Sequence, residues 1–389
     1  MNRQLYIFWT FLKLGATAFG GYMSLVAMVQ KQLVEIDKQL QEEDLLDGIS
    51  LTSMLPGPVA VNVIAYVGYR MGGLWGALWA FIGIILPSLL LVIALSWGYF
   101  AYGHVPAVKN IFLGITPAIT ALIITVAIGM ARKGIRSIHQ IVIAVCSALL
   151  LVFIGGFTLT FCLIVGSGVI GYLLFRHSVE AGGRQEADKM GRKQLVVSVC
   201  VLFVLLSLLL WGGQNRQAPV AWQLLSTFSG ISLTLFGGGY VVIPALHELF
   251  VDQLQWLTSS EFADGIAIGQ ITPGPIFITA TFIGYKVAGV GGALLATLGI
   301  FTPTAVLTVL MSRFVALVNH SVVLKAALKG IRSAVIGMIF ASAVTIGQTI
   351  ALSWVAVALF GVVFLISYIY KVSPIYLILG SGVAGLLLF

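Results

Sequence analysis

The chain has 389 residues, of which 59% are hydrophobic and only 9% are charged. A soluble globular chain carries about a quarter charged residues, so this composition excludes an ordinary soluble protein. The net charge of +8 does not indicate nucleic-acid binding, because the basic residues lie between hydrophobic runs, where they orient membrane proteins. We expect an all-α polytopic membrane protein, since a β-barrel would show short alternating segments instead.

The first part of the chain contains six apolar segments, at about 5–30, 45–69, 73–100, 108–130, 138–155 and 157–175. We expect no cleavable signal peptide, because Asn2 and Arg3 precede an apolar stretch without a small-residue cleavage site. A polar loop at 176–193 and an unpaired apolar segment at about 194–211 follow. Six further segments lie at about 222–250, 262–285, 289–314, 323–348, 350–369 and 374–389. We therefore expect about 12–13 transmembrane segments.

The two parts of the chain are related in sequence. At an offset of 217 the motifs Phe-Gly-Gly, Asp-Gly-Ile and Pro-Gly-Pro recur, and at an offset of 216 further glycines, Pro87 and Lys109 recur as Pro303 and Lys325. So many matches in order indicate duplication. The sequence predicts a first transporter-like repeat over 1–175, a linking region over 176–221 and a second repeat over 222–389.

The number of crossings decides how the repeats are oriented. With thirteen crossings the repeats are inverted, a common plan in membrane proteins with a site at mid-depth, and the basic loops place the N-terminus in the cytoplasm. If the two Pro-Gly-Pro segments turn back without crossing, the repeats are instead parallel and the N-terminus lies outside. Inverted repeats are favoured, but the charge distribution fits both arrangements.

The first apolar segment carries a charge and a glycine motif. Lys13 lies eight residues into it, and a charge inside an apolar segment is usually functional, so Lys13 is a candidate cationic contact; the alternative is that it extends to the interface. The glycine motif occurs in both halves as Phe19, Gly20, Gly21 and Tyr22, and as Phe236, Gly237, Gly238, Gly239 and Tyr240. It is either a close helix contact or an unwound turn whose amides face a ligand.

Pro-Gly-Pro lies in the middle of an apolar segment in each half, as Pro56, Gly57 and Pro58 and as Pro273, Gly274 and Pro275. A continuous helix through these residues is improbable, because proline removes a backbone donor and clashes with the preceding turn. We expect broken or re-entrant helices here. A new helix that starts after each motif would offer free N–H groups and a positive dipole end to an anion. The alternative is a simple proline kink.

Polar side chains accompany both motifs. Ser53 and Gln270 occupy equivalent positions before Pro-Gly-Pro, and Asn62 and Thr279 follow it, so all four are candidate ligands of an oxyanion. Asp47 and Asp264 lie about nine residues before each motif. These carboxylates could bind a coupling proton, pair with a cation, or stabilise a helix N-terminus.

Features of enzymes are missing from the sequence. There is no Walker lysine motif and no second histidine after His247 and Glu248, so we predict neither catalysis nor a cofactor. Cys146, Cys162 and Cys200 lie in apolar runs without metal-ligand spacing and are interpreted as packing residues. Transport, if this is the function, would then depend on ion gradients.

These motifs together resemble the long, two-domain form of the chromate ion transporter family, over nearly the whole chain. The resemblance depends on the glycine and Pro-Gly-Pro motifs, on the acidic stretches near 44–48 and 256–262, and on Gly68, Tyr69, Gly284 and Tyr285. The chain departs from the family pattern at Gln39, where the second half has Trp256, at Ser53, where it has Gln270, and in the residues that follow Gly21.

The resemblance implies efflux of chromate from the bacterial cytoplasm across the inner membrane, with sulfate as a similar competitor. We expect a secondary transporter coupled to protons or to membrane potential. A transporter of sulfate or another inorganic anion is one alternative, and an anion channel-like protein without coupled transport is another. The expected partners are the oxyanion and the lipid bilayer, with a homodimer as a further possible assembly and no nucleic acid.

Overall fold

The computed structural model describes residues 2–18, 22–103, 105–155, 157–180, 218–235, 242–312, 322–348, 350 and 353–389. Helices account for nearly all of these residues, and no strand occurs among them. The all-α class is therefore confirmed. The apolar segment expected at 194–211 lies outside the described residues.

The helices of the two halves follow the same order. The first half contains α1 (Arg3–Thr17), α2 (Tyr22–Val29), the π-helix η1 (Gln30–Ile36), α3 (Glu42–Met54), α4 (Val59–Tyr102), α5 (Pro106–Gly134), α6 (Ile138–Phe153) and α7 (Phe157–Glu180). The second half contains α9 (Val220–Thr234), α10 (Val242–His247), the π-helix η3 (Glu248–Gln253), α11 (Ser259–Ile271), the 3₁₀ turn η4 (Ile276–Ile278), α12 (Thr279–Met311), α14 (Val322–Gly347), α15 (Trp354–Tyr370) and α16 (Pro374–Leu388).

The apolar character of these helices extends to their outer surface. Four of them are long and apolar enough to cross a membrane, at Val59–Tyr102, Pro106–Gly134, Ile276–Met311 and Lys325–Gly347. Large apolar side chains such as Leu74, Phe153 and Trp354 are exposed on the outside, where a soluble protein would place polar groups. The structure is that of a multi-pass membrane protein.

Helix α4 is in fact two antiparallel helices joined by a glycine turn. Gly72 and Gly73 have non-helical dihedrals, with φ of 64° at Gly73. In a continuous helix Gly68 and Gly76 would be about 12 Å apart. A Cβ added to Gly76 would instead lie 2.2 Å from the Gly68 carbonyl oxygen. We call the two parts α4N (59–71) and α4C (74–102).

Helix α12 repeats this reversal. Ala288 and Gly289 are non-helical, and a Cβ added to Gly292 would lie 2.1 Å from the Gly284 carbonyl oxygen. The two parts are α12N (279–287) and α12C (290–311). Only glycine allows two backbones to approach this closely, which explains why Gly68, Gly76, Gly284 and Gly292 recur in both halves.

In each half, the helices on either side of Pro-Gly-Pro form an antiparallel hairpin. Asp44 of α3 forms an ion pair with Arg70 of α4N, and Gly48 contacts the Tyr66 ring. The second half has the same contacts, as an ion pair between Glu261 and Lys286 (2.6 Å) and a contact between Gly265 and the Phe282 ring. We call these the Pro-Gly-Pro hairpins; the ion pair marks the base of each, and the prolines form its tip.

The first apolar segment of each half also turns back. The Tyr6 hydroxyl at the start of α1 donates to the Asp37 carboxylate after η1. In the second half, the rings of Phe228 in α9 and Phe250 in η3 stack with their centroids 4.8 Å apart. The hydropathy pattern predicts one apolar segment over 5–30, whereas the structure has two helices that run in opposite directions on either side of the glycine motif.

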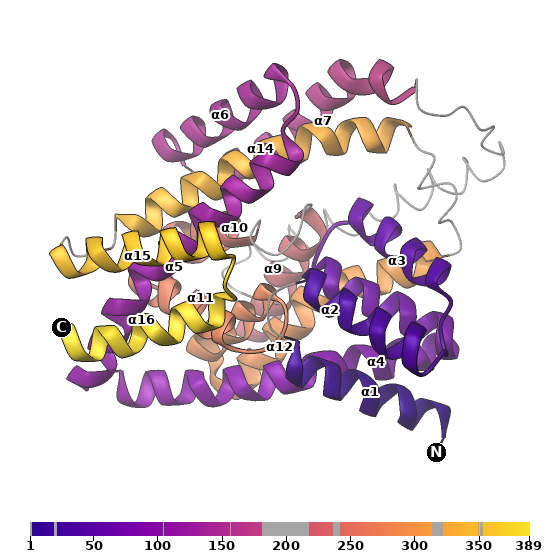
Figure 1. Ribbon diagram of the computed structural model, residues 1–389, viewed down its shortest axis with the longest axis horizontal. Coiled ribbons are helices and arrows are strands. Elements are labelled where there is room, and N and C mark those ends of the chain that lie inside the picture. The colour runs from indigo at the N-terminus through magenta and orange to yellow at the C-terminus, as the bar shows by residue number, and fades with distance from the viewer. Residues whose placement is uncertain are drawn as a thin grey trace.

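The two halves enter the molecule from opposite ends, and α4C shows this directly. Its beginning, at Gly76, contacts the base of the first Pro-Gly-Pro hairpin. Near its other end, the Lys286 ammonium at the base of the second hairpin lies 5.0 Å from the centre of the Phe100 ring. From Gly76 to Phe100 a helix rises about 36 Å. The repeats are therefore inverted, as predicted, although their Pro-Gly-Pro segments form hairpins; the parallel alternative assumed that 5–30 crosses, whereas it turns back as well. In Figure 1, α4 runs along the lower edge of the view from beside α1 to beneath α16.

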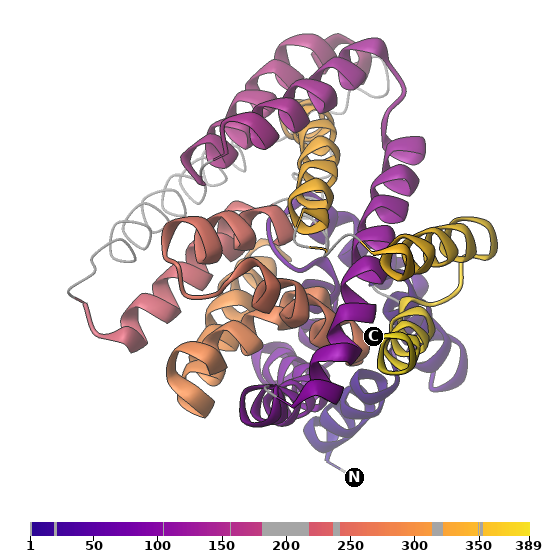
Figure 2. The same ribbon diagram turned by 90° about the vertical axis from the view of Figure 1, so that its left-hand side faces the viewer.

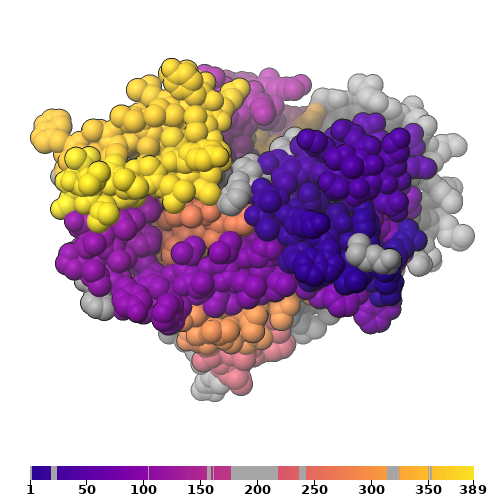
Figure 3. Space-filling model, turned by 60° about the horizontal axis from the view of Figure 1, so that its bottom comes forward, coloured from indigo at the N-terminus to yellow at the C-terminus, as the bar shows by residue number. Residues whose placement is uncertain are grey.

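The remaining helices surround these hairpins. Figure 2 shows α6 and α7 at the top of the molecule, and α14 packs against both. Helix α5 packs against α15 and α16, with Gly114 and Gly385 in close backbone contact. Figure 3 shows α4 (purple) crossing the surface between the N-terminal helices (indigo) and the C-terminal helices (yellow).

Candidate functional site

Both Pro-Gly-Pro motifs interrupt the helix, as predicted. Helix α3 ends at Met54 and α4 begins at Val59, while α11 ends at Ile271 and the next helical turn begins at Ile276. The glycines have φ of 93° at Gly57 and 118° at Gly274, a region that side chains with a Cβ rarely adopt. The alternative of a simple proline kink is therefore wrong.

The tips of the hairpins are bonded across the two halves. The Gly57 N–H donates to the Leu235 carbonyl oxygen (2.7 Å), and the Gly274 N–H donates to the Ala18 carbonyl oxygen (2.9 Å). Ala18 and Leu235 directly precede the two glycine motifs. Each Pro-Gly-Pro tip therefore lies beside the end of the first helix of the other half, α9 or α1. The amides of Gly57 and Gly274 are used in this contact and are not open to a ligand.

Hydroxyl groups from the two long helices support the tips. A Cβ on Gly57 would lie 2.5 Å from Thr304 of α12C, and a Cβ on Gly274 would lie 2.5 Å from Ser88 of α4C. The Ser88 hydroxyl donates to the Pro273 carbonyl oxygen. Ser88 and Thr304 are not among the residues predicted from the sequence. Ser88 follows Pro87 and Thr304 follows Pro303, so the repeated prolines could have indicated both residues.

The start of α4N has the features of an anion site. Its first intrahelical bond runs from the Asn62 N–H to the Pro58 carbonyl oxygen (3.0 Å), so the amides at 59–61 have no acceptor within the helix. The Asn62 side chain is fully buried, and its amide group donates to the Pro56 carbonyl oxygen (3.1 Å). Its other atom, Oδ1, has no hydrogen-bond partner among the described residues.

The corresponding position in the second half is arranged differently. There η4 follows Pro275, and the Thr279 hydroxyl donates to the Ile276 carbonyl oxygen (2.9 Å). Thr279 is buried, like Asn62. Ser53 and Gln270, which precede the tips, are half-buried, and the Ser53 hydroxyl donates to the Ile49 carbonyl oxygen (2.6 Å).

The other predicted residues lie away from the tips or outside the described part of the chain. Lys13 is exposed on α1, more than one turn before Ala18. Asp47 is exposed on α3, whereas Asp264 on α11 is 5% exposed. The glycine motifs lie outside the described residues: Phe19, Gly20, Gly21, Phe236, Gly237, Gly238, Gly239 and Tyr240. Tyr22 begins α2, but its side chain is not described.

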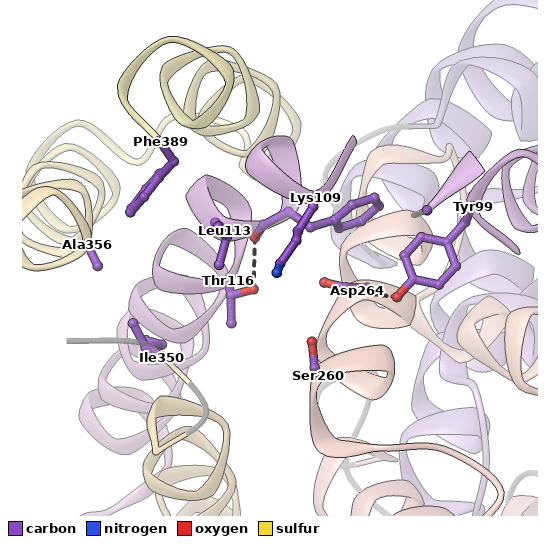
Figure 4. A pocket seen from close by; sticks show the side chains of 11 residues that line it. Tyr99, Lys109, Leu113, Thr116, Ser260, Asp264, Ile350, Ala356 and Phe389 are labelled. Carbon is purple, nitrogen blue, oxygen red and sulfur yellow. Dashed lines mark hydrogen bonds between the residues drawn. The ribbon is translucent and has the colours of Figure 1, made fainter. Parts of the chain in front are cut away.

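Two further residues lie near these positions: Arg332, a charge inside an apolar segment of the sequence, and Tyr99, which no sequence motif indicated. Arg332 of α14 donates to the Ser53 carbonyl oxygen (3.2 Å), which brings a cation close to the first tip. The Tyr99 hydroxyl donates to the Asp264 carboxylate (2.6 Å), as Figure 4 shows. In the part of the chain that the structure describes, no cluster of His, Cys, Asp or Glu could hold a metal ion.

Inverted repeats with interrupted helices that meet at their tips define the class of protein. This is the plan of many secondary transporters, in which broken helices from the two repeats form a site near mid-depth. The chain belongs to the chromate transporter family, whose model matches residues 5–172 and 222–386.

Individual relatives cover almost the whole chain. An uncharacterised transporter of Methanocaldococcus jannaschii is 32% identical, over 99% of this chain and 94% of its own. Chromate transport proteins of Pseudomonas aeruginosa and Cupriavidus metallidurans are 30% and 27% identical, over 98% and 100% of this chain and 92% and 93% of their own. No solved structure matches the chain.

Proposed function

We propose that the protein is a secondary transporter that exports a small divalent oxyanion across the bacterial inner membrane, with chromate as its main cargo. Two relatives along its full length are chromate transport proteins, which points to a transporter rather than an enzyme. The observation that carries the proposal is the reciprocal contact of the two Pro-Gly-Pro tips with the helix ends of the opposite half, through Gly57 and Gly274. Protons or the membrane potential would drive transport.

The length of the hairpins supports re-entry of these segments into the membrane. A helix of 13 residues, such as α3 or α11, is about 20 Å long. The hydrocarbon core is about 30 Å thick, so neither helix spans it. The Gly274 tip meets Ser88, which is midway between the two ends of α4C described above. In this arrangement the hairpins enter from opposite sides and their tips lie near the middle of the membrane.

The chemistry at the first tip suits an oxyanion. The amides at 59–61 and the positive end of the α4N dipole favour a negative ligand. Interrupted backbone at this depth persists where it is buried in protein or lines an aqueous cavity. Arg332, which bonds beside the first tip, would supply the cationic contact, and Asp47 or Asp264 would carry the coupling proton. Sulfate or another inorganic anion fits the same groups. The first experiment must therefore determine which anion is transported.

The test is chromate uptake into everted membrane vesicles, with sulfate as competitor and with an imposed pH gradient. We expect saturable uptake that the gradient accelerates and that sulfate inhibits. Uptake that follows chromate concentration without saturation and ignores the gradient would indicate an anion channel. Inhibition by sulfate together with faster sulfate uptake would assign sulfate as the cargo.

Two variants test the site itself. We expect Arg332→Ala to reduce uptake about tenfold or more, because removal of one charged contact changes the free energy by about 1.5–3 kcal/mol. Pro58→Ala should also reduce uptake, because the proline ring fixes the backbone from which α4N begins. Pro106→Ala at the start of α5 and Lys133→Ala at its exposed end are matched controls, and they should transport normally. Normal uptake by both Pro58→Ala and Arg332→Ala at equal expression would contradict the proposed site.

A further inference from the structure

A chamber with a volume of about 290 Å³ lies away from the hairpin tips, between the ends of α4 and α16 and the helices α5, α11 and α15. Tyr99 lines it, less than one turn before the end of α4 at Tyr102. Because this end of α4C lies beside Lys286 and Phe100, the chamber is at the face from which the second Pro-Gly-Pro hairpin enters.

Four polar side chains from two helices line the chamber. Lys109 and Thr116 lie two turns apart on α5, and Ser260 and Asp264 lie one turn apart on α11. Figure 4 shows the Lys109 ammonium pointing between Thr116 and Asp264. Among the described residues Lys109 has no ion pair, so the chamber contains a cation that is not neutralised. The remaining walls are largely apolar, from residues such as Phe112, Leu113 and Ile350.

Among the described residues that line this chamber, Asp264 has the one carboxyl side chain, and its two oxygens have different surroundings. One oxygen accepts the Tyr99 hydroxyl at 2.6 Å, and the other faces the chamber and Lys109. The side chain is nearly fully buried, at 5% exposure. As a carboxylate it would repel a divalent anion in so small a space. With a proton on the oxygen that faces the chamber, it would become a hydrogen-bond donor beside one ammonium and two hydroxyls.

We propose that this chamber binds a divalent tetrahedral oxyanion only together with a proton on Asp264. The proton comes from the aqueous phase at this face, and the anion enters and leaves unchanged. Without the proton, Lys109 pairs with the carboxylate and the anion is excluded. This inference rests on the proposed transport function; because the proton and the anion bind together and move in the same direction, the membrane potential rather than the proton gradient would drive export. By linkage, a bound anion strengthens proton binding by the same factor as the proton strengthens anion binding.

The residues that line the chamber differ in part from their equivalents in the other repeat. Lys109 and Asp264 have counterparts in Lys325 and Asp47, but Thr116 corresponds to Arg332. Arg332 donates to the Ser53 carbonyl oxygen, and Asp47 is exposed. The opposite face therefore has a second cation and an exposed carboxylate in place of a buried carboxyl group. The proton requirement then belongs to Asp264 and not to Asp47.

Other charged groups near Asp264 are already engaged. Glu261, on the same helix, pairs with Lys286 of α12N. Lys109 comes from α5, Tyr99 from α4, and α16 contributes Phe389 to the wall. Lys109 is therefore the cation that lines the chamber beside Asp264. Among the described residues it has no carboxylate partner.

The experiment is sulfate binding to the purified full chain in lipid nanodiscs over a series of pH values, with proton uptake followed by an indicator dye. We expect the affinity of the wild type to fall as pH rises, approaching about tenfold per pH unit, and one proton to be taken up per sulfate bound. In Asp264→Asn, the neutral amide should remove both the pH dependence and the proton uptake.

Two further variants complete the test. Lys109→Gln should weaken sulfate binding about tenfold or more while one proton is still taken up, and this variant keeps the test valid if Asp264→Asn does not fold. Glu42→Gln, an exposed acidic residue at the start of α3, is the control and should behave as the wild type. Retention of the pH dependence in Asp264→Asn, its loss in Asp47→Asn, or pH-independent binding by the wild type would each overturn the proposal.

The binding experiment can contradict the chamber proposal without contradicting the proposed transport function. A protein that neither binds sulfate nor transports chromate contradicts both proposals. A protein that transports chromate, and whose Asp264→Asn variant retains the pH dependence of sulfate binding, contradicts the chamber alone.

Discussion

Single glycines determine the shape of the hairpin tips. Gly57 and Gly274 have positive φ, and each lies against a side chain of the opposite half, Thr304 or Ser88. Each also donates its N–H across the repeat boundary. A substitution at these glycines therefore affects the backbone conformation, the packing and one hydrogen bond at the same time.

Replacement of Gly57 by alanine should destabilise the protein and abolish transport. The positive φ costs about 1–3 kcal/mol for a residue with a Cβ. The new methyl group would also lie 2.5 Å from Thr304. Thermal unfolding of the purified protein, followed by tryptophan fluorescence, measures the loss. Gly98→Ala is the control, because Gly98 lies within helical α4C and a Cβ there meets no atom within 4 Å. Equal unfolding temperatures for the two variants would contradict this account of the tip.

Residue type alone did not separate functional from ordinary positions. Asp47 and Asp264 are equivalent in sequence, yet one is exposed and the other is buried against Tyr99. The difference arises because Tyr99 comes from α4C, which is remote in sequence from α11. For the same reason the sequence did not identify Tyr99 or Thr304, whose partners are contributed by the opposite repeat.

At the scale of elements, hydropathy separated 45–69 from 73–100 but missed the reversal inside 5–30, and it did not show how closely the separated helices pack. The boundary predicted between 69 and 73 coincides with the turn at Gly72 and Gly73, where α4N reverses into α4C. The signal was present in the repeated glycines Gly68 and Gly76. Their meaning becomes clear only when two antiparallel helices are seen to touch through them.

Substitution of Gly76 by valine should prevent the packing of α4N on α4C. Even the first carbon of the new side chain would lie 2.2 Å from the Gly68 carbonyl oxygen. Overpacking of this kind destabilises by about 3 kcal/mol. We expect little monodisperse protein on size-exclusion chromatography, and the same for Gly292→Val. Gly129→Val on α5, where a Cβ meets no atom within 4 Å, should elute normally. Normal elution of Gly76→Val would show that the hairpin is not required.

At the scale of the whole molecule, the inverted arrangement separates two equivalent surfaces. The bases of the two Pro-Gly-Pro hairpins lie at opposite ends of α4C, about 36 Å apart by the rise of a helix. Equivalent residues near these bases, such as Glu42 and Ser259, should therefore face opposite sides of the membrane.

Cysteine labelling tests this topology. In a background without native cysteines, Glu42→Cys and Ser259→Cys should react with a membrane-impermeant thiol reagent from opposite sides, because their repeats enter from opposite faces. Intact cells and everted vesicles are compared for each variant. The side on which Glu42→Cys reacts also determines the orientation of the N-terminus. Labelling of both positions from the same side would indicate parallel repeats.

The sequence by itself determined the membrane class, the duplication and the broken backbone at Pro-Gly-Pro, because hydrophobicity, repetition and the restrictions on proline are local properties of a chain. Only the tertiary structure decided that 5–30 turns back, that each tip bonds to the other half, and that Asp264 rather than Asp47 is buried. These features depend on contacts between residues far apart in the chain, and neither composition nor periodicity records such contacts.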